Sequence, residues 1–559
     1  MKFAKAALAV AAVVVVAGAL SITRPGYSVD EEYTVFAVRG IAQHGVPLLP
    51  SNLLYDRGIA YSYVSWLAGA ITAAELPAFR MIGLLSAALV VLLTYLLVRR
   101  LATEAAALSA SIFVTLSVPF WATATSGRFY APFLAAFVLS LYFLTHRHWW
   151  IGLIAAVMLA RLTHELAFLL AIIPAVAWLM ARGDRRFWFL MMLSVGLGLV
   201  LGQLVLFGFH FAAPSSGETM VRRFFLWQVL NLFEAPGERQ FMIPLVVLAV
   251  GVVLAPRRVW PMTVVALSVF TLILSMSIAQ ASNSAPLSWP LVQCVLVEGS
   301  RYPLDMFWHL MRLTPITLLT GIAFLVYRSR GEWPAKQRAA HLIWIGWVLW
   351  FGVIESGITT NYMLLPLSFV LIAIAIDAAT ILPRAAVIAL ALVIGVEQWR
   401  ATTLAEARPT IVVEGIEEIK SGLGPNDRVV CTDELGCLML VGRIDRWLAL
   451  DEYVRERFLV RRGDGPVTGV YTGVPAVFRP ADLFAPNPDG TLPDRIVVVD
   501  VFKDYPIGNS RSWLPKAIEE DGVKVTPLLE TRQARVLEVS APEALAIARL
   551  PRDQVARFK

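Results

Sequence analysis

The sequence predicts a polytopic α-helical membrane protein of about 13 transmembrane helices, followed by a C-terminal α/β domain. Hydrophobic residues make up 58% of the chain and charged residues only 16%, with a mean hydropathy of +0.67. A soluble domain carries about 25% charged residues. Apolar windows of about 20 residues, the length needed to cross the hydrocarbon, recur up to residue 400. Residues 401–559 have ordinary charge and short β-rich runs between Pro and Gly turns.

The N-terminal segment 1–22 has a basic start and an apolar core. A cleaved signal peptide and a retained first span both have this pattern. We favour the retained span because the apolar stretch is longer than a usual signal core. Either reading places residue 24 onward on the outer face.

Basic clusters between the apolar runs predict the topology, because short cytoplasmic loops are rich in Lys and Arg. This rule also accounts for much of the net charge of +7, so we expect no nucleic-acid partner. The N-terminus is then inside and the C-terminal domain outside. The predicted spans are 5–22, 79–98, 104–122, 129–145, 149–160, 165–181, 187–207, 241–255, 261–280, 310–327, 340–355, 362–380 and 384–398.

Two segments of the chain contribute to the predicted outer face in a more complex way than a short loop does. Residues 149–181 are too long for one helix between basic flanks, so we predict a hairpin of two short helices. Arg161 and Glu165 lie at its tip, where they either line a cavity or form an i,i+4 ion pair. The first outer loop, 23–78, is the longest, and its apolar stretch 61–74 predicts a helix along the membrane interface.

Three acids, Asp30, Glu31 and Glu32, follow the first span by a few residues. Adjacent side chains cannot all point one way, so one or two at most face a common cavity. Acids are also favourable in the first turn of a helix. The alternatives are therefore a solvated helix start and a carboxylate that reaches a membrane-embedded substrate.

Outer-face arginines favour the second alternative. Near the hydrocarbon boundary, a guanidinium can bind phosphate through its planar fork, although single snorkelling arginines are common. Several around one acidic loop indicate an anionic lipid substrate with a carboxylate base nearby. They are Arg57, Arg80, Arg128, Arg161 and Arg301.

Four stretches carry a resemblance to a known family over roughly residues 5–400. They are Asp30-Glu31, GIAYSYVSWLAGA (58–70) leading to Phe79-Arg80, SGRFYAPF (126–133), and NYMLLPLSFVL (361–371). The chain resembles the GT-C superfamily of glycosyltransferases, and within it the bacterial relatives of protein O-mannosyltransferases and of the aminoarabinose transferase. Asn361 departs from the pattern, because relatives often have Arg there.

The resemblance implies inverting transfer of a sugar from a polyprenyl phosphate, undecaprenyl phosphate in a bacterium, to an acceptor hydroxyl. The enzyme would lie in the bacterial inner membrane with its soluble domain in the periplasm, and would need no metal and no cofactor. The partners would be the lipid donor, the acceptor glycan, lipid or protein, and membrane lipids.

Residue roles follow from that chemistry. Asp30 is the expected general base. The leaving phosphate needs countercharge, for which we expect Arg57, Arg128, Arg301 and Arg161 or His164. Glu31 orients the acceptor, pairs with an arginine or caps a helix, and Tyr130 and Tyr302 bind phosphate or sugar or anchor the chain at the interface. We expect Arg80 to be a boundary residue.

The C-terminal domain is predicted to be α/β. The runs 427–433, 446–451, 469–478 and 494–502 read as strands, 513–522 as a helix and 523–530 as extended chain. It lacks a Gly-rich phosphate loop, so no nucleotide site is indicated. Cys431 and Cys437 either form a disulfide or remain buried thiols. The domain either caps the active site, guides the acceptor or only stabilises the fold.

A polytopic transporter or a flippase for a lipid-linked sugar is the alternative function. Such proteins carry internal repeats and helices broken by Gly or Pro at matching places. We find neither in the sequence, and a transporter does not need charges gathered on one face. The sequence therefore favours an enzyme.

Overall fold

The computed structural model describes two compact units. The described residues are 2–28, 30–72, 75–146, 148–171, 173–174, 185–212, 314–329, 364–404, 411–449, 459–461, 466–486, 491–501, 518, 523–531 and 534–540. The first unit holds the described residues up to Arg24 and those from Tyr55 to Leu404. The second holds those of the segment Pro25–Leu54 and those from Ile411 onward.

The first unit is helical. Its elements are α1 (Lys2–Ile22), α3 (Ile59–Thr72), α4 (Glu75–Leu101), α5 (Glu104–Leu116), α6 (Val118–Ala124), α7 (Tyr130–Leu144), α8 (Trp150–Thr163), η1 (Glu165–Ala171), α10 (Arg185–Ala212), α16 (Pro315–Ser329), α18 (Leu364–Ile381) and α19 (Arg384–Leu404). Among the described helices, α1, α4 and α10 are long and apolar enough to cross a membrane. The predicted spans 241–255, 261–280 and 340–355 lie outside the described residues.

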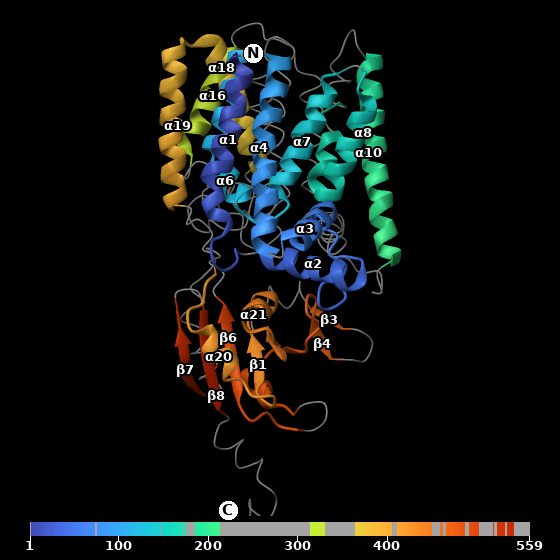
Figure 1. Cartoon of the computed structure of the whole chain (residues 1–559), viewed down its shortest axis with the longest axis vertical. Coiled ribbons are helices and arrows are strands. Elements are labelled where there is room, and N and C mark those ends of the chain that lie inside the picture. The colour runs from blue at the N-terminus through green and yellow to red at the C-terminus, as the bar shows by residue number, and fades with distance from the viewer. Residues whose placement is uncertain are drawn as a thin grey trace, which may run out of the picture. The chain divides into compact units, whose positions relative to one another are not determined.

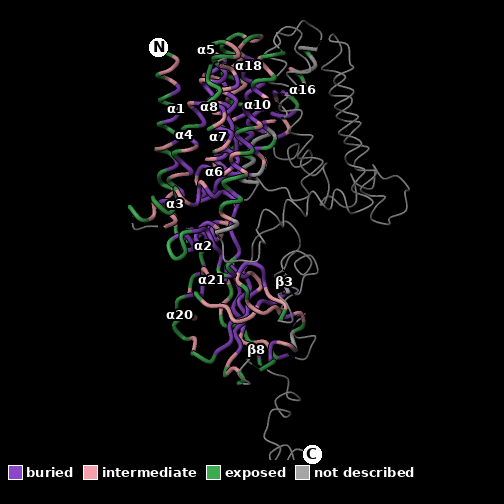
Figure 2. Tube along the Cα trace, turned by 90° about the vertical axis from the view of Figure 1, so that its right-hand side faces the viewer, coloured by how far each residue is buried: buried purple, intermediate pink, exposed green. Residues whose placement is uncertain are grey.

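Helix α4 packs against α1, α5 and α7, and α8 packs between α7 and α10 (Figure 1). Buried residues run through the middle of this bundle (Figure 2). Small residues allow the close approaches, as is usual for helices in lipid. A Cβ on Gly18 of α1 would lie 2.3 Å from Leu84 Cδ1, and one on Gly198 of α10 would lie 2.7 Å from the carbonyl oxygen of Ile154.

The predicted span 104–122 is not one continuous helix, because α5 and α6 meet at a bend of 69°. Pro119 explains the break. Its ring clashes with the carbonyl four residues earlier and it has no amide hydrogen to donate. Ser117 is extended at the bend, and the Val118 amide donates to Gln398 Oε1 at 3.1 Å. The bend therefore leaves this amide satisfied inside the bundle.

The second unit is built on a six-stranded sheet in the order β5-β2-β1-β6-β8-β7. The pairs β5-β2, β2-β1 and β1-β6 are parallel, and β6-β8 and β8-β7 are antiparallel. The strands are β1 (Arg428–Cys431), β2 (Arg446–Leu448), β5 (Ala476–Val477), β6 (Ile496–Val501), β7 (Lys524–Glu530) and β8 (Ala534–Ser540), with β3 (Leu459–Arg461) and β4 (Val467–Gly469) forming a separate pair and α2 (Glu31–His44), α20 (Ile416–Ser421), α21 (Glu434–Val441) and η4 (Pro480–Phe484) completing the unit.

The strands predicted at 427–433, 446–451 and 494–502 are confirmed as β1, β2 and β6, and the extended stretch 523–530 as β7. The predicted strand 469–478 is wrong, because a turn at Gly473, which has a φ of 74°, separates β4 from β5. Sequence analysis did not predict β8. The predicted helix 513–522 lies outside the described residues except for Ile518, which is helical.

Cys431 and Cys437 form a disulfide that joins the end of β1 to α21, so the first of the two alternatives holds. Their Cα atoms are 6.1 Å apart. Both side chains are fully buried. The bond therefore fixes α21 against the central strand of the sheet.

Residues 25–54 belong to this second unit. Hydrogen bonds to the C-terminal part of the chain hold both ends of this segment. The Ile411 amide donates to the Tyr27 carbonyl at 2.6 Å, and the Tyr27 hydroxyl donates to the Gly436 carbonyl at 3.1 Å. At the other end of the segment, Ser51 Oγ donates to the Val470 carbonyl at 2.6 Å.

Glu434 is a buried acid in this unit and makes its stability depend on pH. It is 2% exposed, its Oε1 accepts from the Thr472 hydroxyl, and its Oε2 has no hydrogen-bond partner within the described residues. Burial raises the pKa of Glu434 from 4.5 to about 8. The folded protein therefore holds this proton where the unfolded chain has lost it.

We expect stability to fall as pH rises from about 4.5 to about 8, by at most about 1.4 kcal/mol per pH unit from this group. Glu434→Gln should flatten the dependence and raise the melting temperature at pH 7.5. Thermal unfolding of the full chain in detergent between pH 5 and 8.5 measures this. The exposed Glu417→Gln is the matched control, and an unchanged pH slope in the Glu434 variant would contradict the assignment.

Candidate functional site

The three acids of the segment that begins α2 differ in how deeply they are buried. Glu31 and Glu32 are both 0% exposed, whereas Asp30 is partly exposed. Glu31 Oε2 accepts from the Ser28 amide at 2.7 Å, as a helix-capping residue does. The Asp30 carboxylate does not cap α2, and its backbone is left-handed with a φ of 74°. Of the three acids, Asp30 is therefore the one placed to meet another molecule.

Tyr33 and Tyr471 hold this segment against the C-terminal domain. Their ring centroids lie 5.1 Å apart in an edge-to-face arrangement, which stabilises beyond area burial alone. Burial, followed by the neighbouring Tyr471, Asp30 and Glu32, raises the pKa of Tyr33. The Ser51 amide also donates to the Tyr471 carbonyl at 3.0 Å. The turn after β4 thus contacts both ends of the segment that carries Asp30.

A basic cluster forms in the helical unit around the ring of Phe129. The guanidinium carbon of Arg128 lies 4.7 Å from the ring centroid and that of Arg57 lies 5.7 Å from it. Arg128 Nη1 donates to Tyr55 Oη at 2.7 Å. The two arginines are 2% and 7% exposed. A Cβ on Gly58 would lie 2.7 Å from Phe129 Cδ1, and the φ of this residue is +71°. Glycine is therefore required here, because it has no side chain and adopts a positive φ without strain.

Tyr55 and His164 extend the cluster. Burial raises the pKa of Tyr55 to about 12, so its hydroxyl keeps a hydrogen to donate. The His164 ring lies 5.1 Å from Phe129 and 5.8 Å from Tyr130, centroid to centroid. His164 Nδ1 accepts from the Leu166 amide, so neutral His164 carries its hydrogen on Nε2. The cluster therefore offers several donors to one anion.

Two of the predicted arginines have other contacts. Arg161 Nη2 donates to Gln203 Oε1 of α10 at 2.7 Å. Its guanidinium group also lies over the Phe168 ring of η1. Arg80 is fully buried, and its Nη1 donates to the Arg24 carbonyl at 2.8 Å and to the Ile22 carbonyl at 3.3 Å. These bonds satisfy carbonyls at the last residue of α1 and just beyond it. The placement of Arg80 at the membrane boundary stays a prediction.

The structure thus brings together Arg57, Arg128, Tyr130 and His164, and it describes Asp30 and Glu31 in the other unit. The predicted Arg301 and Tyr302, with Asn361, lie outside the described residues. Sequence analysis missed Tyr55, Phe129 and Tyr471. Tyr55 stands two residues before Arg57, which was a usable signal, whereas nothing local to Tyr471 indicates its packing on Tyr33.

The arrangement allows anion binding at the basic cluster and proton transfer at Asp30. Two buried guanidinium groups and a tyrosine hydroxyl match the oxygens of a phosphate. Within the described residues, no three His, Cys, Asp or Glu side chains lie close enough together to hold a metal ion.

No family model and no curated protein matches the chain by sequence. Among solved structures, the oligosaccharyltransferase from Archaeoglobus fulgidus in the apo form superposes with a TM-score of 0.51 at 14% identity, over 88% of this chain and 69% of that chain. The same enzyme tethered with an acceptor peptide gives the same values. ArnT from Cupriavidus metallidurans bound to undecaprenyl phosphate aligns over 95% of this chain and 97% of that one, at 12% identity and a TM-score of 0.45. The chain therefore has the GT-C fold expected from the sequence.

Loss of the Ser51 hydroxyl should loosen the acidic segment. Ser51 Oγ donates to the Val470 carbonyl and accepts from the Leu53 amide, and such buried bonds are worth about 1–2 kcal/mol. In Ser51→Ala we expect the amides of α2 to exchange hydrogen about 5- to 30-fold faster. Hydrogen-exchange mass spectrometry of the full chain measures this. Thr72→Ala removes an exposed hydroxyl and should change nothing; equal exchange in both variants would show that Ser51 does not hold the segment.

Proposed function

We propose that the chain is an inverting GT-C glycosyltransferase that moves a sugar from a polyprenyl phosphate to an acceptor hydroxyl. The observation that carries the proposal is the pair of buried guanidinium groups, Arg57 and Arg128, which both lie against the Phe129 ring. Arg128 also donates to the Tyr55 hydroxyl. Likeness of fold to an oligosaccharyltransferase adds support as an analogy, since fold alone does not determine function.

The basic cluster would bind the phosphate that leaves. A phosphate monoester is already a stable anion, so its departure needs countercharge more than a general acid. Arg57 and Arg128 supply two charged forks, and Tyr55 supplies an O–H. Cation–π contacts with Phe129 hold both guanidinium groups beside an apolar wall, where their field is stronger than in water.

Asp30 would act as the general base. The acceptor oxygen forms a bond to the anomeric carbon on the side opposite the phosphate, the bond from that carbon to the phosphate oxygen breaks, and the acceptor proton moves to the Asp30 carboxylate.

The orientation of the protein follows from its disulfide and its loops. A disulfide between Cys431 and Cys437 persists in an oxidising compartment. With basic loops inside, the C-terminal domain and Asp30 lie on the periplasmic face of a bacterial inner membrane. The sugar and the acceptor are open in this proposal, which fixes only the lipid-phosphate donor and the reaction.

Asp30→Asn should lower transfer at least about 100-fold while leaving membrane abundance normal, because a positioned general base contributes about 10²–10⁴-fold. Transfer from radiolabelled polyprenyl-phosphate sugars to membrane extracts measures it. Asp482→Asn, which alters an acid with a 38% exposed side chain in the C-terminal domain, is the control. Turnover near that of the wild type would remove Asp30 from its role.

Arg128→Lys keeps the charge but loses the planar fork. We expect the KM for the lipid donor to rise at least about 10-fold, equivalent to about 1.4 kcal/mol, with a smaller change in kcat. Steady-state kinetics against donor concentration, together with the thermal shift produced by undecaprenyl phosphate, separate these effects. Arg479→Lys changes an exposed arginine and serves as the control. An unaltered donor KM would contradict phosphate binding by Arg128.

A further inference from the structure

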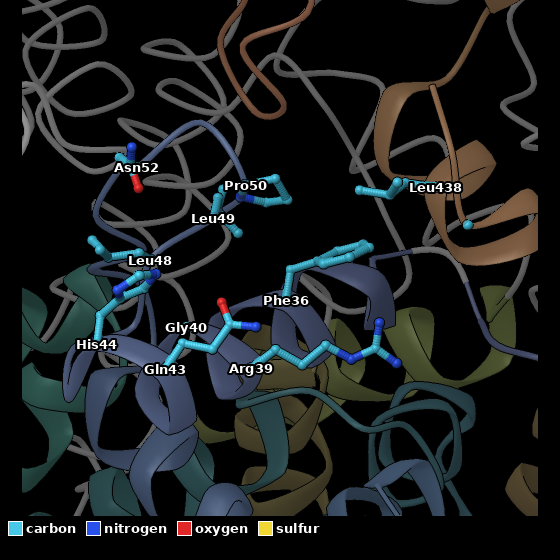
Figure 3. Close-up of a pocket in the computed structure, with 11 residues that line it drawn as sticks. Phe36, Arg39, Gly40, Gln43, His44, Leu48, Leu49, Pro50, Asn52 and Leu438 are labelled. Carbon is cyan, nitrogen blue, oxygen red and sulfur yellow. The ribbon is translucent and has the colours of Figure 1, made fainter. Parts of the chain in front are cut away.

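A surface pocket of about 360 Å³ lies within the second unit, beside α2 (Figure 3). This volume is at the lower end of the range for small-molecule sites, about 300–1,000 Å³. Its walls come from one face of α2, from the loop that follows α2, and from α21. From α2 come Phe36, Arg39, Gly40, Gln43 and His44, and from the loop come Leu48, Leu49, Pro50 and Asn52. Leu438 of α21 and Gly442, directly after it, complete the lining.

The loop wall is fixed by its backbone. A Cβ on Gly40 would lie 2.3 Å from the carbonyl oxygen of Leu48, so only glycine allows the loop to fold back on α2. The Asn52 amide donates to the Leu49 carbonyl at 2.8 Å, and the Leu49 amide donates to the Leu53 carbonyl at 2.9 Å. The pocket is therefore preformed, which lowers the ordering cost of binding.

The polar side chains that line the pocket are Arg39, Gln43, His44 and Asn52. Arg39, Gln43 and His44 are exposed and project from α2, with Pro50 and Leu438 across from them in the loop and in α21 (Figure 3). An arginine has five N–H donors and no acceptor. Of the described residues that line the pocket, none is an aspartate or a glutamate. Arg39 therefore gives this lining a positive charge.

The ligand must combine negative charge with hydroxyl groups. Arg39 supplies a charged fork for a phosphate or carboxylate. The amides of Gln43 and Asn52 both donate and accept, as a hydroxyl-rich ligand requires. Leu48, Pro50 and Leu438 give the apolar wall against which the C–H face of a sugar ring can pack.

We propose that this pocket binds an anionic saccharide, one that carries a phosphate or a carboxylate. Arg39 lies nine residues beyond Asp30 along α2, so the pocket is on the order of 14 Å from the proposed base along the helix. The pocket would thus hold a part of the acceptor remote from the reacting hydroxyl. The assignment of the ligand as part of the acceptor rests on the proposed function, whereas the binding of an anionic saccharide does not.

Direct binding tests the proposal without turnover. The full chain in detergent is titrated calorimetrically with glucose 6-phosphate, glucuronic acid, glucose and inorganic phosphate. We expect both anionic sugars to bind at least 10-fold more tightly than glucose or phosphate alone. Arg39→Gln should weaken the anionic sugars at least 10-fold, and Arg479→Gln, an exposed arginine of the same unit, should not.

Asp30→Asn separates this pocket from the reaction. If Asp30→Asn abolishes transfer and keeps the binding of anionic sugars, both proposals stand. If Asp30→Asn transfers normally while Arg39-dependent binding persists, only the general-base role fails. Binding of glucose as tight as that of glucose 6-phosphate, phosphate alone binding as tightly as either anionic sugar, or binding untouched by Arg39→Gln would each overturn the saccharide site.

Discussion

The packing of residues 25–54 on the C-terminal domain is the constraint on which the proposed site depends. This segment carries Asp30, and its contacts run to Ile411, Gly436 and Val470. A loop of this length attached only at its two ends would sample many conformations, at an entropic cost to any ordered site. Packing on the C-terminal domain removes that freedom. The C-terminal domain therefore fixes the segment that carries Asp30.

Two buried ions of the helical unit lie at helix ends. Arg80 donates to carbonyls at the C-terminal end of α1, where the helix dipole favours a cation. Glu397 shows the converse, because its carboxylate accepts from the amides of Ile316 and Thr317 at the N-terminus of α16. An apolar bundle can hold such groups because each meets backbone groups that would otherwise lack partners. These two ions are structural.

The sequence predicted what depends on local pattern. Apolar runs predicted most of the described helices of the first unit, and local patterns predicted four of the six strands of the sheet. The choice of Asp30 from its position after the first span stays a prediction. The bend at Pro119 was missed, although proline signals it, because a continuous apolar run was taken for one span. The turn at Gly473 was missed because the run 469–478 was taken for one strand, although glycine signals a turn.

Contacts between distant residues could not be predicted from one sequence. Tyr27 and Gly436 are 409 residues apart, and Arg128 and Tyr55 are 73 apart. Arg57 and Arg128 were chosen as span-end arginines, but their shared contact with Phe129 is a product of tertiary packing. The hydrogen bond from Arg161 to Gln203 is equally invisible in the sequence, since the two residues are 42 apart.

The placement of the described charges fits the proposed enzyme better than a transporter. A transporter binds its substrate near the middle of the bilayer, between helices whose broken ends line a cavity. Here the break between α5 and α6 has its Val118 amide bonded to Gln398 and buried apolar neighbours in Val118 and Phe120. The cationic cluster instead gathers at helix ends, with Arg57 and Arg128 each two residues before a helix and His164 directly after one. Charges at that level suit a lipid headgroup held at the membrane surface while chemistry occurs there, which is the arrangement that a lipid-phosphate glycosyltransferase requires.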